Sequence, residues 1–168
     1  MAAITDLSTL TGIANADWLV VHDLTDATDK KISRQNLIAP MGAWTPTIEG
    51  TTGNPSSVTF STATGWYIDL GGIVIASFSL ITSAISGGSG SLRIAGLPIA
   101  ATSSVGIGAA AGKINMDAGY TQMTLSPISG TTKFYVLISG DNVASGLPSI
   151  SAWGNDSDLS GTLIYKVI

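Results

Sequence analysis

The stretch 73-IVIASFSLI-81 decides the fold class of this protein. One set of alternate positions is wholly apolar and consists of Val74, Ala76, Phe78 and Leu80. The other set carries Ser77 and Ser79 at its centre. A pattern of period two is typical of a β-strand that buries one face in a core. A membrane-spanning helix would need about 20 predominantly apolar residues, and serine interrupts this run too early for that.

Short runs of similar character recur after Pro40 and are cut by turn-forming residues. The further strand candidates are 57-SVTFS-61, 91-SLRIAG-96, 113-KINMD-117, 121-TQMTL-125, 133-KFYVLIS-139 and 161-GTLIYKVI-168. Turns are predicted at 53-GNPS-56, 87-GGSG-90, 129-SGTT-132, 140-GDN-142 and 154-GND-156. Repeated short strands with turn signals favour an all-β body of the sandwich, jelly-roll or barrel type.

Residues 1–40 differ in composition, since they contain eight of the eighteen charged residues and the one histidine. The pattern predicts a strand over 18–24, a turn over 25–30 and a return strand over 31–33. A short helix over 34–39 would follow, capped by Ser33 and ended by Pro40. A hairpin of this size is not stable alone in water.

A partner surface is therefore expected for residues 1–40. Packing on the chain's own body is one interpretation, and a separate docking module, favoured by the change in composition, is the other. The residues that we expect to dock are Trp18, Val20, His22, Leu24, Lys31, Ile32 and Leu37.

The low charge of the chain predicts self-association. Charged residues make up 11% of the chain, against about 25% in a typical soluble domain. The surface must then consist of Ser, Thr, Gly and Ala, or another chain must cover much of it. The net charge of −4 and the lack of a large basic cluster argue against nucleic acid as a partner. No cysteine is present, which excludes disulfides, thiol catalysis and cysteine-bound zinc.

The sequence also lacks a convincing catalytic constellation, so we expect no enzymatic activity and no cofactor. His22 is the one histidine, and Asp23 beside it on a strand would point to the opposite face. The glycines of 106-GIGAAAG-112 lack the strand, helix and acidic partner of a dinucleotide site. We interpret that segment as a loop or β-bulge. The few carboxylates of the body are scattered, whereas glycan cleavage needs a pair about 5–10 Å apart.

The segment 155-NDSD-158 has two interpretations that the residues leave open. Its side-chain oxygens suit Ca²⁺, but Asn and Asp are also favoured in a simple polar turn. A tryptophan beside polar groups would also suit sugar recognition. The residues that we expect to contact a receptor lie in the loops 140–146 and 153–158 and are Asp141, Asn142, Trp153, Asn155 and Asp156.

Two parts of the chain resemble proteins of tailed-phage virions. The segment 4-ITDLSTLTGIANADWLVVHDLTDATDKKISRQNLI-38 is similar to an N-terminal module found on many of them. The segment 43-AWTPTIEGTTGNPSSVTFSTATGWYIDLGGIV-74 resembles the start of a compact β-domain common at the C-terminus of phage tail fibres, and 88-GSGSLRIAGLP-98 fits the same domain. Only Met41 and Gly42 separate the two parts, so the chain departs from a fibre with a long shaft.

The resemblance implies two domains, 1–40 for docking on the virion and 41–168 as a jelly-roll-like β-sandwich, in a homotrimer around a threefold axis. It implies a short tail fibre on the virion, made in the host cytoplasm, whose low-charge body packs its apolar faces against sibling chains. The implied partners are copies of itself, a tail, baseplate or major capsid protein, and as a candidate a host cell-surface glycan. A capsid decoration protein, cement protein or head fibre is the alternative, and a freestanding carbohydrate-binding module is a third hypothesis.

Overall fold

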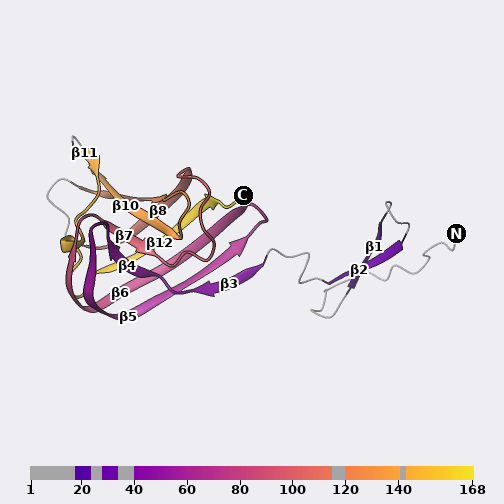
Figure 1. Cartoon of the computed structure of the whole chain (residues 1–168), viewed down its shortest axis with the longest axis horizontal. Helices are drawn as coiled ribbons and strands as arrows, with labels where there is room; N and C mark the ends of the chain where they lie inside the picture. The colour runs from indigo at the N-terminus through magenta and orange to yellow at the C-terminus, as the bar shows by residue number, and fades with distance from the viewer. Residues whose placement is uncertain (1–17, 24–27, 34–39, 115–119, 141–142) are drawn as a thin grey trace. The chain divides into compact units, whose positions relative to one another are not determined.

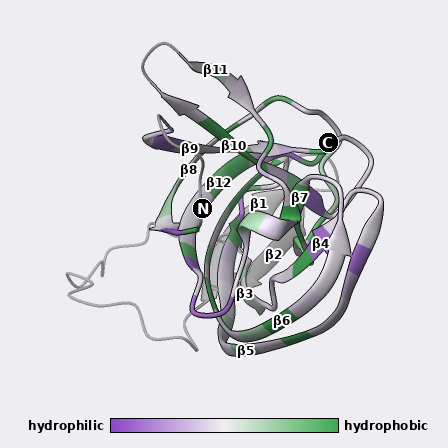
Figure 2. Cartoon of the chain, turned by 90° about the vertical axis from the view of Figure 1, so that its left-hand side faces the viewer, coloured by the Kyte–Doolittle hydropathy of each residue, from purple (hydrophilic) through white to green (hydrophobic). Residues whose placement is uncertain are grey.

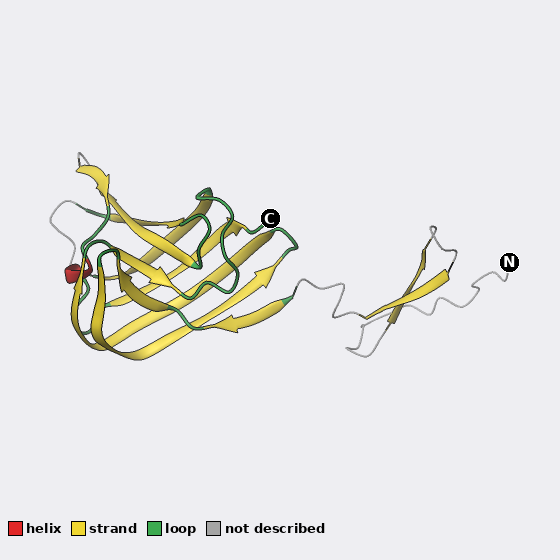
Figure 3. Cartoon of the chain, in the orientation of Figure 1, coloured by secondary structure: helices red, strands yellow, loops and turns green. Residues whose placement is uncertain are grey.

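The computed structural model describes residues 18–23, 28–33, 40–114, 120–140 and 143–168 (Figure 1). The prediction of an all-β protein is confirmed. The described residues form strands, with one short 3₁₀ helix, η1 (Ile150–Ala152), and no α-helix (Figure 3). No helix in this part of the chain is long and apolar enough to cross a membrane. The chain divides into two compact units, Met1–Pro40 and Met41–Ile168.

The described residues of the first unit form an antiparallel hairpin of β1 (Trp18–Asp23) and β2 (Thr28–Ser33). The second strand begins three residues earlier than the sequence suggested. Pairing of Asp23 with Thr28 satisfies backbone groups that a longer turn would leave open. The predicted helix over 34–39 lies outside the described residues.

The second unit, which we call the body, is one antiparallel sheet. Its strands are β3 (Met41–Trp44), β4 (Thr47–Gly50), β5 (Gly53–Asp69), β6 (Ile73–Ser89), β7 (Leu92–Ala95), β8 (Gly106–Lys113), β9 (Gln122–Pro127), β10 (Lys133–Gly140), β11 (Val143–Gly146) and β12 (Asp158–Lys166). They pair in the order β3-β5-β6-β12-β8-β9-β10-β7-β4, and β11 adds to β10. The two outermost strands, β3 and β4, are consecutive in sequence and separated by Thr45 and Pro46. The sheet therefore curls until its ends approach (Figure 2).

The expected jelly-roll-like sandwich of two sheets is thus replaced by a single curled sheet. The long pair β5 and β6 explains the curvature. Its register shifts between Pro55 and Ser57 and twice more between Thr59 and Thr62. Such irregularities bend a strand and increase its twist, which allows one sheet to wrap around its own core. Residues 53–56, which the sequence predicts as a turn, instead form the start of β5, where the register shift after Pro55 lies.

The core fills the inside of this curl. The face of β6 that decided the fold is buried as expected, with Val74, Ala76 and Leu80 at 0% exposure and Phe78 at 5%. Phe78 packs between the rings of Trp44 and Phe134, at centroid distances of 6.1 and 5.3 Å. This face is buried within its own chain, so it is not the surface that would meet sibling chains.

The largest error of the sequence interpretation concerns residues 106–112. They form β8, a central strand between β12 and β9, and not a loop or bulge. The inward positions of β8 are small because the curl leaves no room for side chains. A Cβ added to Gly108 would lie 2.6 Å from the Cβ of Leu125 and 2.9 Å from the Cδ1 of Leu163. The sequence predicts a strand over 113–117, but Lys113 is the last residue of β8. Residues 115–119 lie outside the described part.

Candidate functional surfaces

In the loop 153–158, which we expected to contact a glycan, Trp153 is buried in the core and hydrogen-bonded to Thr82. Trp153 is 3% exposed, and its Nε1 donates a hydrogen bond of 3.1 Å to the Oγ1 of Thr82. The same hydroxyl donates to the carbonyl oxygen of Gly154 at 2.9 Å. Thr82 itself is 1% exposed on the inner side of β6. Because the indole ring is covered, it offers no face on which a sugar could stack, and we no longer place Trp153 on a contact surface.

The acidic and amide groups of the same loop point to separate backbone partners. The Oδ1 of Asn155 accepts from the backbone N–H of Ile85 at 3.0 Å, and the Oδ1 of Asp158 accepts from that of Lys113 at 2.7 Å. Asp156 is exposed and has a φ of 60°, which is typical of a residue in a tight turn. In the described part of the chain no three acidic or histidine side chains come together as a metal site. The hydrogen bonds of Asn155 and Asp158 are those of a polar turn, and Ca²⁺ binding by this segment is not tested by them.

The structure describes some of the other predicted site residues and not the rest. Leu24, Leu37, Asp141 and Asn142 lie outside the described residues. The hairpin register sets Val20 opposite Lys31, Leu19 opposite Ile32 and His22 opposite Asp29, with Trp18 at the first pair. The docking role of these residues remains a prediction.

One charged cluster lies on the outside of the sheet, across β4, β7 and β10. Glu49 accepts from the Nε of Arg93 at 3.0 Å and from the Nζ of Lys133 at 2.7 Å. The side chains are 17%, 22% and 30% exposed. This cluster ties the last strand of the sheet to its neighbours. Both cations are already engaged with one carboxylate, so the cluster does not form an open anion site.

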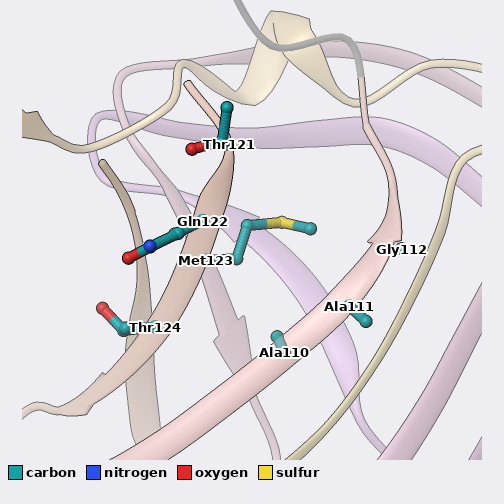
Figure 4. Close-up of a pocket in the computed structure, with 7 residues that line it drawn as sticks. All are labelled: Ala110, Ala111, Gly112, Thr121, Gln122, Met123 and Thr124. Carbon is teal, nitrogen blue, oxygen red and sulfur yellow. The ribbon is translucent and has the colours of Figure 1, made fainter. Parts of the chain in front are cut away.

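A cavity of about 480 Å³ opens where β8 and β9 diverge after only two paired residues. It is lined by Ala110, Ala111, Gly112, Thr121, Gln122, Met123 and Thr124 (Figure 4). The side chain of Met123 points across the gap toward β8. Among the described residues, the polar groups of this lining are the hydroxyls of Thr121 and Thr124 and the amide of Gln122.

The one described group with a strongly shifted pKa is structural. Burial raises the pKa of Tyr165 to about 12. Its hydroxyl donates to the carbonyl oxygen of Ile99 at 3.0 Å, and the residue is 2% exposed. Every buried side-chain nitrogen or oxygen of the described residues has a hydrogen-bond partner. The hydrogen bonds of these buried groups therefore stabilise the fold.

A surface that the sequence interpretation missed lies on the outer face of the sheet. The ladder pairs Met41 with Ile68, Ile68 with Ile75, Ile75 with Ile164, and Ile164 with Ile107. These five residues form a row across β3, β5, β6, β12 and β8. Trp66 lies in the next row, opposite Ser77. We call these six residues the outer apolar face. The outward-facing isoleucines were visible in the sequence, but only the strand order shows that they line up.

No known protein family matches the sequence, and no curated protein matches it. Among solved structures, the chain is similar to the crystal structure of the Dettilon tailspike protein (gp208). The TM-score is 0.59 at 22% sequence identity, and the match covers 76% of this chain. The chain matches only 23% of the length of that protein. At this identity the likeness shows the fold, a curled antiparallel sheet.

Proposed function

We propose that this chain is a structural protein of a tailed-phage virion that contacts the host surface as part of the tail. The observation that carries the proposal is the shared fold with a tailspike protein over 76% of the chain. The order of motifs over 4–38, 43–74 and 88–98 points independently to virion proteins.

In its more specific form, the proposal is a short homotrimeric tail fibre. Residues 1–40 dock on a tail or baseplate protein, and the β-sheet body contacts a host cell-surface glycan or another receptor. The division into two units after Pro40 fits this separation of tasks.

One observation favours a second candidate, a decoration or cement protein of the capsid. The first strand of the body begins at Met41, directly after the first unit ends, so no shaft separates a docking part from the body. A protein that lies flat on a shell has no need of a shaft.

Gold-antibody labelling of intact virions, with antibody raised against residues 41–168, tests the proposal. Label confined to the tail or baseplate supports the fibre, and label spread over the head supports the decoration protein. Virions without label, from a phage that expresses the chain, would contradict both. As a functional control, loss of the protein should abolish adsorption if it is a fibre. If it is a cement protein, its loss should lower the temperature at which DNA escapes.

A further inference from the structure

The outer apolar face is unusual for a surface of a soluble chain. Four of its residues are strongly exposed: Met41 at 69%, Trp66 at 52%, Ile107 at 80% and Ile164 at 42%. Ile68 and Ile75 between them are partly exposed. Isolated exposed apolar residues are common, but the strand register places these side by side across five neighbouring strands.

The six apolar side chains alone are as large as the largest apolar patch of a typical monomer, and the small residues around them extend the face toward the size of an interface. Its six side chains leave on the order of 500 Å² of apolar surface exposed, while the largest patch on a typical monomer is about 300–600 Å². Exposed Ala and Thr residues surround it, among them Ala43, Ala109 and Thr162. With these, the face approaches the roughly 800 Å² that each partner contributes to a standard protein interface.

The face also carries no charge. Across the outward-facing rows of β5, β6, β12 and β8, charged residues appear only at the two ends, Lys166 opposite Ile73 and Asp158 between Ile81 and Lys113. The outward-facing rows between these ends contain only apolar, alanine, serine and threonine residues. Depletion of charge in the centre, with tryptophan present, is characteristic of protein interfaces.

The polar groups on the face are already paired with one another. The Oγ of Ser77 and the Oγ1 of Thr162 are 2.8 Å apart, and the Oγ of Ser160 donates to that of Ser79 at 3.1 Å. If a partner chain covers these hydroxyls, they keep the hydrogen bonds that they make with one another, so their burial costs less than that of unpaired hydroxyls. For the same reason they offer few free donors and acceptors to a glycan, whose recognition depends on such groups.

We propose that the outer apolar face is the surface through which copies of this chain assemble. The occupant is a second copy, because the face is charge-free, approaches the size of one partner's share of an interface, and is present on every chain. This inference rests on the homotrimer of the proposed function and names the surface that holds it together. It assigns assembly to the outside of β3, β5, β6, β12 and β8, with Ile75 of β6 in the middle of the row.

Sedimentation velocity of the full-length chain at micromolar concentration tests this surface. The variant is Ile107→Lys combined with Ile164→Lys, two exposed positions where lysine can keep its charge in water in the isolated chain. The matched control is Leu147→Lys, which makes the same change at 41% exposure outside the face. We expect the wild type and the control to sediment as oligomers. The double variant should dissociate at least 100-fold more readily, with an unchanged circular dichroism spectrum.

Hydroxyl-radical footprinting of Met41 and Trp66 gives a second measurement that does not depend on the variant's folding. Protection in the wild-type oligomer supports the proposal, and full reactivity overturns it. Protection in a monomer would mean that another part of the same chain covers the face, which also overturns it.

The failures of the two proposals are distinguishable. A wild-type oligomer that survives the folded double variant overturns this surface but leaves the homotrimer intact. A wild-type monomer overturns the homotrimer and this surface together, and virion labelling then decides the virion role on its own.

Discussion

Gly65 in β5 provides the sharpest test of how the curled sheet is packed. It faces inward, directly beneath the indole ring of Trp44 on β3, with which it is paired. A Cβ added at Gly65 would lie 2.5 Å from the Cε2 and 2.8 Å from the Cδ1 of that ring. The Nε1 of Trp44 donates to the carbonyl oxygens of Ser77 and Trp66, at 3.2 and 3.3 Å. The substitution Gly65→Ala therefore has to move a buried, hydrogen-bonded ring.

The magnitude follows from three contributions. The ring must shift by about 1 Å to reach ordinary contact, and overpacking of this kind costs about 1–3 kcal/mol. The same shift stretches both hydrogen bonds beyond useful length, and an unsatisfied buried donor costs about 1–3 kcal/mol. Replacing glycine by alanine also lowers the conformational entropy of the unfolded chain, which stabilises the folded state by about 0.4–1 kcal/mol. Together these contributions lower the free energy of unfolding by about 1–6 kcal/mol, which lowers Tm by roughly 2–24 °C.

Urea unfolding at a fixed protein concentration, followed by circular dichroism, measures this change. The control is Gly154→Ala, where an added Cβ meets nothing within 4 Å. It should leave the unfolding midpoint unchanged or slightly higher. In a Trp44→Leu background the ring is gone, so Gly65→Ala should cost much less than in the wild type. A loss below about 0.5 kcal/mol in the wild type, or an equal loss in both backgrounds, would refute the packing argument.

Two further predictions concern buried polar groups. The substitution Thr82→Val should lower the free energy of unfolding by about 1–3 kcal/mol, because the Nε1 of Trp153 loses its hydrogen-bond acceptor. Thermal unfolding at neutral pH measures this loss, and an unchanged Tm would contradict the prediction. Tyr165 has a pKa raised to about 12 when folded, against about 10 when unfolded, so its contribution is full below pH 10 and is lost as the pH rises toward 12. The wild type should therefore lose roughly 2–3 kcal/mol more than Tyr165→Phe between pH 9 and 12 in urea titrations, and parallel losses in the two proteins would contradict it.

The sequence predicts the fold best where a single strand carries its own signal. Alternation in β6 identified the buried face of Val74 to Leu80, because one face of that strand meets the core and the other does not. In β8 the signal is absent, since its inward positions hold Gly106, Gly108, Ala110 and Gly112. These residues are small because strands distant in sequence fill the space in front of them. Such a requirement belongs to the tertiary structure, and local propensity cannot show it.

The candidate contact loop shows the same limit for function. Trp153, Asn155 and Asp156 have the residue types of a sugar-binding loop, and nothing local reveals that Thr82 draws the indole into the core. The partner of Trp153 is 71 residues away in the chain. Composition therefore suggested a contact role for Trp153, whose ring the structure buries. Asn155 and Asp156 are exposed, and their contact role stays a prediction.

The low charge of the chain now has a more specific explanation. The resemblance to virion proteins implies apolar faces packed against sibling chains, but the most apolar strand face, that of β6, forms the core of the body itself. A core does not require the outside of the sheet to lack charge, since an exposed strand face ordinarily alternates with charged residues. Yet the outer rows of β5, β6, β12 and β8 carry no charge between Lys166 and Asp158. The charge depletion that remains after the core is accounted for is thus concentrated on the outer apolar face, where assembly of copies would bury it.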